Sequence, residues 1–322
     1  MTAPTVIPGA SGTPEAPGTA EVPGPGVPGT PGARATQRRN FRRGVLRVLR
    51  RKPSRIVGVA ILAVFAFMGV FGPLLYPARL PRDDDALYAA PSWAHPFGTD
   101  FEGTDVLALV VTGARYVLLT ALVTAVITVA VGTSVGLFAG FRRGRWDSVL
   151  MRITDMKLTI PALPLLLVLS TVWKFTGPLQ MGLVLGLLGW GGVARAVRAQ
   201  TLSLRERGFI EAARGLGLST RHIIGRELLP SMAPFIAMNM LIAVTGAVYA
   251  QVGLFFLGVL PFDANNWGVM LNLAVFGGGA LTTTAALPYM LAPLLAILLL
   301  TLGIVLVVDA MDEIFNPRLR EE

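Results

Sequence analysis

The sequence predicts an all-α polytopic membrane protein with six transmembrane helices. Of its 322 residues, 53% are hydrophobic and 15% are charged, a more apolar composition than soluble domains have. Long apolar stretches recur along the chain, and the segments between them are alternately rich and poor in arginine and lysine. Apolar stretches of this length, with positive charge on alternate connections, are typical of a chain that crosses a bilayer several times.

The residues before the first apolar stretch predict no folded domain. Residues 1–33 are dominated by Pro, Gly, Ala and Thr. They bury too little apolar surface to offset the entropy lost on folding, so we expect a disordered tail. Residues 34–55 are rich in arginine and contain no acidic side chain. Such charge can bind nucleic acid, but this segment runs directly into an apolar stretch, so we expect it to contact membrane lipid and to bind no nucleic acid.

Six apolar stretches justify the six helices. At about 1.5 Å per residue, roughly 20 residues cover the hydrocarbon layer of about 30 Å. The third stretch is interrupted by charged residues, among which Asp155 can pair with Arg152, and the fourth is short. We expect the spans at residues 56–76, 117–139, 149–173, 180–194, 232–257 and 286–308. They form one transmembrane domain over residues 56–315, followed by a cytoplasmic tail over residues 316–322.

The basic residues between the spans predict the orientation of the chain. Arginines cluster after the second span and again between the fourth and fifth spans, whereas residues 258–289 contain no arginine or lysine. Basic connections of membrane proteins stay in the cytoplasm. We therefore expect both termini to be cytoplasmic and residues 258–289 to lie on the opposite side of the membrane.

Small residues on two of the spans predict how those helices pack. Glycines recur every fourth residue on the second span, at Gly132, Gly136 and Gly140, and on the fourth span, at Gly182 and Gly186. Such stripes allow two helix backbones to approach closely in lipid. A role in conduction is an alternative, but we expect these glycines to serve packing.

The cytoplasmic segment at about residues 198–230 predicts two short helices joined by a turn. Gly217 can adopt the left-handed backbone conformation that ends the first helix. Ser219 or Thr220 can cap the second helix, which Pro230 would stop or kink. An apolar stripe on this segment needs a partner, which is either another protein or the bilayer and the chain's own bundle. The stripe consists of Phe209, Ala212, Ala213 and Leu216.

Several motifs resemble one family of membrane proteins. The run Glu211-Ala212-Ala213, followed by Gly217 and by Leu229-Pro230, is similar to the EAA loop of binding-protein-dependent ABC importer permeases. Three further stretches resemble the oligopeptide and dipeptide type of permease C subunit: His95-Pro-Phe-Gly-Thr-Asp100, the run from Gly253 to Gly258 before Asn266-Trp-Gly268, and Asn316-Pro-Arg-Leu-Arg320. The resemblance covers nearly everything from the first span onward and leaves out the tail.

This resemblance implies a type I ABC importer permease fold and an assembly in a bacterial cytoplasmic membrane. The implied partners are a second homologous permease subunit, two ATP-binding subunits at the cytoplasmic face and an extracytoplasmic substrate-binding protein. The chain has no Gly-Lys-Ser/Thr phosphate loop, so we expect ATP and Mg²⁺ on the partner subunits and no catalytic residue or cofactor here. The EAA loop would be a coupling helix in a cleft of an ATPase subunit, through Phe209, Glu211, Ala212, Ala213, Leu216 and Gly217.

The resemblance implies peptides as the substrate, although similar permeases transport oligosaccharides or nickel. Four polar residues on the fifth span are candidates to line the translocation path: Asn239, Thr245, Tyr249 and Gln251. Hydrogen bonds between helices would explain these residues equally well.

Two other functional classes remain as alternatives. An ion-coupled secondary transporter usually carries acidic or histidine residues within its spans, and this chain has few of them. A membrane scaffold that only docks a partner is the other alternative. We expect no metal site, because His95 and His222 lie far apart in the sequence and there is no cysteine.

Overall fold

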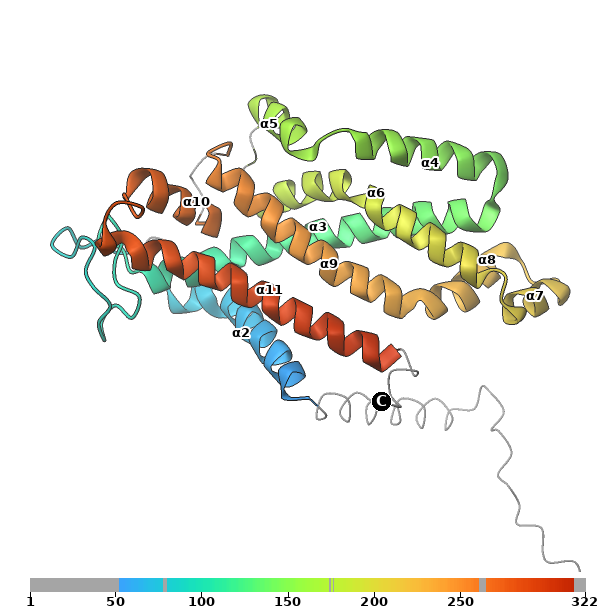
Figure 1. The fold of residues 1–322 in the computed structure, drawn as a ribbon, viewed down its shortest axis with the longest axis horizontal. Helices are drawn as coiled ribbons and strands as arrows, with labels where there is room; N and C mark the ends of the chain where they lie inside the picture. Colours follow the sequence, from blue (N-terminus) through green and yellow to red (C-terminus); the bar gives the residue numbers. More distant parts are fainter. Residues whose placement is uncertain (1–51, 78–79, 174, 176, 261–264, 316–322) are drawn as a thin grey trace, which may run out of the picture. The chain divides into compact units, whose positions relative to one another are not determined.

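The described residues form a bundle of helices (Figure 1). The computed structural model describes residues 52–77, 80–173, 175, 177–260 and 265–315, all within the unit Arg47–Glu322. In this part of the chain, five helices are long and apolar enough to cross a membrane: α2 (Pro53–Leu75), α3 (Val106–Arg142), α6 (Pro178–Leu204), and the helices at Thr220–Phe256 and Thr284–Glu313. The prediction of an all-α polytopic protein is confirmed. The expected tails 1–33 and 316–322, and nearly all of the basic segment, lie outside the described residues.

The third predicted span is two helices rather than one. Helix α4 (Gly144–Thr159) and helix α5 (Ala162–Val172) are bent by 79° relative to each other, and six spans result when the pair counts as one. The break occurs at Ile160 and Pro161, which are both extended. Proline has no N–H for a helical hydrogen bond and disfavours helical backbone at the preceding residue, so Pro161 accounts for the break.

Ion pairs link α4 to α6. Asp155 accepts hydrogen bonds from Arg195 on α6, at 3.0 Å from Nε and 2.5 Å from Nη2, and therefore does not pair with Arg152 as expected. Asp147 binds Arg198 with both carboxylate oxygens, at 2.5 and 2.7 Å. A bidentate arginine–carboxylate pair fixes orientation as well as distance.

Each glycine stripe packs against the other helix of the pair α3 and α6, which confirms the packing prediction. A Cβ atom added at Gly136 would lie 2.5 Å from the carbonyl oxygen of Ala194, and one added at Gly186 would lie 2.7 Å from the Cβ of Ile127. Thr124 donates a hydrogen bond across the seam to the carbonyl of Gly182, at 3.2 Å. The contacts advance in step along both helices, so α3 and α6 run parallel. Residues 143–177 therefore return from one end of the bundle to the other, as a third span must.

The fifth span begins much earlier than expected. Helix α8 (Thr220–His222) continues through the π-helix η1 (Ile223–Leu228) into α9 (Leu229–Phe256) as one helix of 37 residues. Pro230 does not stop the helix, so of the expected stop or kink the stop is wrong. The π-turn ends with Leu229, whose N–H bonds five residues back to Ile224. This wider turn directly precedes Pro230, where the backbone lacks a donor.

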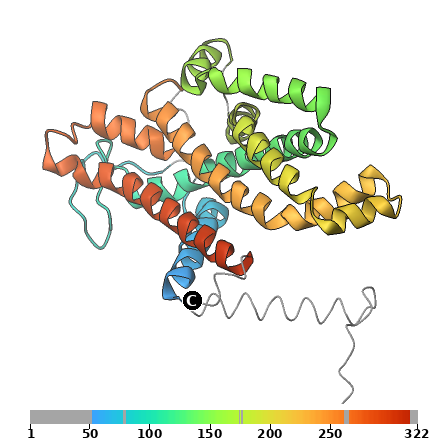
Figure 2. The same cartoon turned by 45° about the vertical axis from the view of Figure 1, so that its right-hand side comes forward.

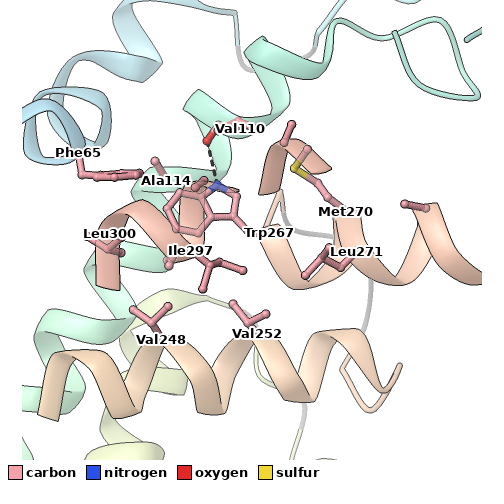
Figure 3. Close-up of a cluster of buried hydrophobic side chains, with 14 of the residues drawn as sticks. Phe65, Val110, Ala114, Val248, Val252, Trp267, Met270, Leu271, Ile297 and Leu300 are labelled. Atoms are coloured by element: carbon pink, nitrogen blue, oxygen red, sulfur yellow. Dashed lines mark hydrogen bonds between the residues drawn. The ribbon is translucent and has the colours of Figure 1, made fainter. Parts of the chain in front are cut away.

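A buried tryptophan joins four segments in the largest hydrophobic core (Figure 3). Trp267 begins α10 (Trp267–Asn272), is fully buried, and donates a hydrogen bond from Nε1 to the carbonyl of Val110 on α3, at 3.0 Å. Its ring meets the edge of Phe65 on α2, with centroids 5.7 Å apart. Ile297 of α11 (Leu287–Phe315) belongs to the same core. After α10 the chain passes through the short helices η2 (Leu273–Gly277) and η3 (Thr284–Ala286).

The ends of the bundle can be told apart by their contacts. Near the beginning of α2, Arg55 is buried and forms an ion pair with Glu313 near the end of α11. Gly72, near the other end of α2, packs against Val111 at the start of α3. The beginning of α2 and the end of α11 therefore lie toward the last turn of α3. Figures 1 and 2 show α7 at one end of the bundle and α10 at the other.

Candidate functional site

The predicted helix-turn-helix is present but shorter than residues 198–230. Residues up to Leu204 continue α6, and the long helix begins at Thr220. Between them lies α7 (Gly208–Gly215). After α7, the N–H of Leu218 bonds to the carbonyl of Ala213 at 3.2 Å and that of Gly217 to Arg214 at 2.9 Å. This pair of bonds is the Schellman arrangement, in which the residue that turns the chain is left-handed.

Gly217 adopts the left-handed conformation that the sequence predicts, with φ 72°. No atom lies within 4 Å of the position where its Cβ would be, so the requirement for glycine comes from the backbone conformation and not from lack of space. Ser219 then caps the next helix by accepting a hydrogen bond from the N–H of His222, at 3.3 Å. The turn between the helices is thus fixed at both of its ends by local hydrogen bonds.

Helix α7 has an outward face and an inward face. Phe209 and Leu216 are 42% and 79% exposed, and Glu211 and Ala212 are also exposed. Ala213 differs from its predicted companions, because it is 6% exposed and packs inward together with Ile210. The outward stripe is therefore Phe209, Ala212 and Leu216, with Glu211 beside it. We call these four residues the outer face of α7.

The inward face of α7 rests on a hydrophobic cluster built from several helices. Ile210 and Ala213 join buried residues of α3, α6, η1 and α9: Leu137, Phe141, Val193, Val197, Ile223, Leu228 and Met232. Apolar contacts of this kind hold α7 against three long helices.

Two arginines fasten the segment around α7 to the last turn of α3. Arg205 donates hydrogen bonds to the carbonyls of Gly140 and Phe141, at 3.3 and 2.9 Å, and so satisfies acceptors that the helix end leaves open. Arg214 lies over the ring of Phe141, 5.3 Å from its centroid. Burial lowers the pKa of the Arg205 guanidinium, as do the positive charges of Arg143 and Arg214. Sequence reasoning missed this role of Arg205, since the partners are backbone carbonyls distant in sequence.

The four predicted path residues on α9 have different surroundings. Asn239 and Thr245 are partly buried and donate hydrogen bonds to carbonyls one turn earlier, at 2.9 and 3.2 Å. Gln251 is fully buried and donates to the carbonyl of Val117 on α3, at 2.9 Å. Tyr249 is 53% exposed, with its hydroxyl bonded to Thr301 of α11 at 3.1 Å. The structure does not bring these four side chains to one surface.

Tyr249 borders an apolar cavity. The cavity has a volume of about 670 Å³ and lies between α3, α5, α6 and α9, where its lining includes Thr124, Thr128, Leu166, Leu185, Gly246 and Gly253. Among the predicted path residues, Tyr249 is the one that lines it. Pockets with a largely apolar lining bind apolar groups.

The motif from His95 to Asp100 organises the loop that leads into α3. His95 Nδ1 lies 2.8 Å from a carboxylate oxygen of Asp105, whose other oxygen caps α3 by accepting from the N–H of Ala108 at 2.9 Å. Thr99 bonds to the backbone of Ala86 and Ala89. These contacts give the motif a structural role at the start of α3.

Two family models match the chain. Residues 132–321 match the model described as binding-protein-dependent transport system inner membrane component. Residues 40–91 match the N-terminal TM domain of oligopeptide transport permease C. The first match contains α7 and most of the bundle.

Named relatives are similar over most of their length. A putative peptide permease protein of Brucella suis is 34% identical over 273 residues, which cover 82% of this chain and 87% of the relative. The dipeptide transport system permease protein of Bacillus subtilis is 33% identical over 232 residues, covering 70% and 71%. The oligopeptide transport system permease protein of Mycobacterium bovis is 32% identical over 278 residues, covering 86% and 94%.

Proposed function

Because this chain belongs to the binding-protein-dependent transport system inner membrane components, we propose that it is the permease subunit of an ATP-driven importer of peptides. It is a multi-pass membrane protein and a transport subunit, and other subunits hydrolyse ATP in systems of this family. We propose that its partners are a second homologous permease subunit, two ATP-binding subunits and an extracytoplasmic substrate-binding protein.

The observation that carries this proposal is the outer face of α7. Phe209, Ala212 and Leu216 expose an apolar stripe at the end of the bundle, while Ile210 and Ala213 hold the same helix against α3, α6 and α9. An exposed stripe on a helix of this kind fits a groove in a partner protein. We propose that the ATPase subunit provides this groove and that Glu211 and Gly217 contribute to the fit.

The contacts at the two ends of the bundle support the predicted orientation. The beginning of α2 and the end of α11 lie toward the end that carries α7, as do the described arginines at the end of α3 and around α7. We propose that this end faces the cytoplasm of a bacterium, so that both termini are cytoplasmic and α10 is extracytoplasmic.

The similarity to the dipeptide and oligopeptide permeases supports peptides as the substrate. We propose that the apolar cavity beside Tyr249 lies on the translocation path, together with Asn239 and Thr245 of the same helix. We propose a supporting role for Gln251, because its hydrogen bond to the carbonyl of Val117 holds α9 against α3.

Reconstitution tests the proposal. The chain is combined with its partner permease, the ATPase subunits and the binding protein in liposomes, and uptake of a labelled dipeptide, an oligosaccharide and Ni²⁺ is measured. We expect dipeptide uptake that requires both ATP and the binding protein and that continues when ionophores remove ion gradients. Uptake driven by an ion gradient without ATP would identify a secondary transporter, and uptake of only the oligosaccharide or Ni²⁺ would overturn the peptide assignment.

A further inference from the structure

A second cavity opens where α3 and α11 begin, at the opposite end of the bundle from α7. Its volume is about 770 Å³. Its lining combines carboxylates, amides and a phenol with apolar side chains: Leu80, Arg82, Asp100, Phe101, Glu102, Thr104, Leu109, Asn265, Asn266, Val269, Met270, Leu273 and Tyr289. None of these residues was singled out as a binding residue by the sequence.

Tyr289 lines this cavity with a phenol ring and its hydroxyl. The residue is 2% exposed, and its ring packs against the edge of Phe101, with centroids 6.2 Å apart. Its hydroxyl makes no hydrogen bond to any residue that the structure describes. Tyr88, by contrast, donates from its hydroxyl to the carbonyl of Gly278 at 2.9 Å. Because Tyr289 is buried elsewhere and lines the cavity, its hydroxyl is available to a ligand in that cavity.

Asp100 brings a buried carboxylate to the same cavity. It is 4% exposed and accepts two backbone hydrogen bonds, from Glu102 at 2.9 Å and from Thr104 at 2.8 Å. Both bonds end on Oδ1, so Oδ2 accepts neither of these backbone donors. Burial raises the pKa of the Asp100 carboxyl, although hydrogen bonds from the backbone of Thr104 and Glu102 and from the Thr104 side chain act in the opposite direction.

The two acidic side chains of the cavity are not equivalent. Glu102 pairs with Arg82 at 2.6 Å, whereas Asp100 has no cationic partner in the described part of the chain. Asn265 adds a further acceptor, because its amide nitrogen donates to Thr112 at 3.2 Å and its carbonyl oxygen is left for another group. The cavity therefore presents a carboxylate, a phenol oxygen and an amide oxygen to a ligand that can donate several hydrogen bonds.

We propose that this cavity binds a primary ammonium group, namely the amino terminus of the transported peptide. An ammonium group is a cation with three donors and no acceptor, which matches these three oxygens in charge and in number. The apolar lining at Phe101, Met270 and Leu273 then contacts the first side chain of the peptide. This inference rests on the proposed function, because it takes the substrate to be a peptide that enters from the end carrying α10.

Thermal unfolding of the detergent-purified complex, without the binding protein, tests the inference directly. Binding to the folded state raises the unfolding temperature. We expect Ala-Ala and methylammonium to raise it and N-acetyl-Ala-Ala and sodium, at equal ionic strength, to leave it unchanged. Asp100→Asn should lower the affinity for Ala-Ala about tenfold or more, and Tyr289→Phe should lower it about three- to tenfold, because each removes a hydrogen bond to a charged group.

Matched variants separate binding from folding. Tyr289→Phe deletes a hydroxyl that bonds to no described residue, so the complex should keep its unfolding temperature without ligand. Asp100→Asn keeps an oxygen for the two backbone donors. Tyr88→Phe is the control, because Tyr88 does not line the cavity, and it should bind Ala-Ala like the wild type. Equal stabilisation by sodium, equal binding of the acetylated peptide, or wild-type affinity in both Asp100→Asn and Tyr289→Phe would each overturn the inference.

Uptake by the same wild-type preparation distinguishes this site from the proposed function. If the complex imports dipeptide but Ala-Ala and methylammonium do not stabilise it, the ammonium site is wrong and the importer stands. If the complex imports no peptide, the proposed function fails, and the assignment of the cavity to a peptide amino terminus fails with it, whatever methylammonium does.

Discussion

Ala212 and Ala213 are chemically identical neighbours with opposite surroundings, and they provide the sharpest test at the scale of single residues. Ala212 is exposed on the outer face of α7, so Ala212→Arg should leave folding intact while its bulk and charge reduce docking of the ATPase. We expect co-purification of the ATPase subunits to fall at least about tenfold at unchanged protein level, with a parallel loss of uptake. Pull-down and uptake from the same membranes measure both effects.

Ala213→Arg is the matched comparison, because Ala213 is 6% exposed and packs inside the cluster with Ile210. It should lower the stability of the permease itself by about 3 kcal/mol or more, as an unpaired buried charge does. Wild-type pull-down by Ala212→Arg would refute ATPase docking on the outer face and would favour a helix that rests on the bilayer surface.

Gly217 supports a second prediction, which depends on backbone conformation alone. Its φ is 72° and nothing lies within 4 Å of an added Cβ. Gly217→Val should strain the turn, at a cost of about 1–2 kcal/mol, and lower coupled uptake, whereas Gly217→Asn should keep most of it, because asparagine tolerates the left-handed region. Uptake at matched protein level measures the difference. Equal uptake by the two variants would mean that the angle between α7 and α8 does not matter.

Backbone features that depend only on neighbouring residues could be predicted from the sequence. The left-handed Gly217 and the cap at Ser219 depend on a few neighbouring residues, and both predictions are confirmed. Which alanine of α7 faces outward depends on Phe141 and Met232, which lie far away in sequence and close the cluster beneath the helix. For the same reason, the hydroxyl of Tyr289 and its cavity left no signal in the sequence.

At the scale of elements, the glycine seam between α3 and α6 is the most easily tested contact. Gly136→Leu places atoms where a Cβ is already 2.5 Å from the carbonyl of Ala194, and backbone cannot move aside as a side chain can. We expect a loss of about 3 kcal/mol or more and a lower unfolding temperature in detergent. Gly192→Leu on α6 is the control, since no atom lies within 4 Å of its added Cβ. Equal unfolding temperatures would show that the two helices are not in close contact.

The number and approximate position of the long helices could be predicted from apolar runs, because a bilayer dictates their length. Where a helix breaks was harder to foresee. Pro161 separates α4 from α5, whereas Pro230 lies in a continuous helix because a π-turn precedes it. Whether a proline ends a helix therefore depends on the backbone geometry of the turn before it, which the local sequence did not reveal.

The orientation of the whole molecule yields the last prediction. Both termini and α7 should be cytoplasmic, and the turn at Thr282 should be extracytoplasmic, because arginines cluster around α7 whereas residues 258–289 contain no arginine or lysine. Reporter fusions at Met1, Glu322 and Thr282 determine this. A reporter at either terminus that is active only outside the cytoplasm would contradict the orientation, as would one at Thr282 that is active only inside.

The close approach of α3 and α6 limits how this protein can change shape. Backbones interlocked by five glycines, with threonine hydrogen bonds across the seam, can slide or part only by passing through steric overlap along their shared length. These two helices therefore form a strut of constant dimensions. Helix α4 is held to that strut from one side, through an exposed ion pair at Asp155 and a partly exposed pair at Asp147, which exchange far more readily with water. An opening and closing motion would thus move α4 more easily than it would separate α3 from α6.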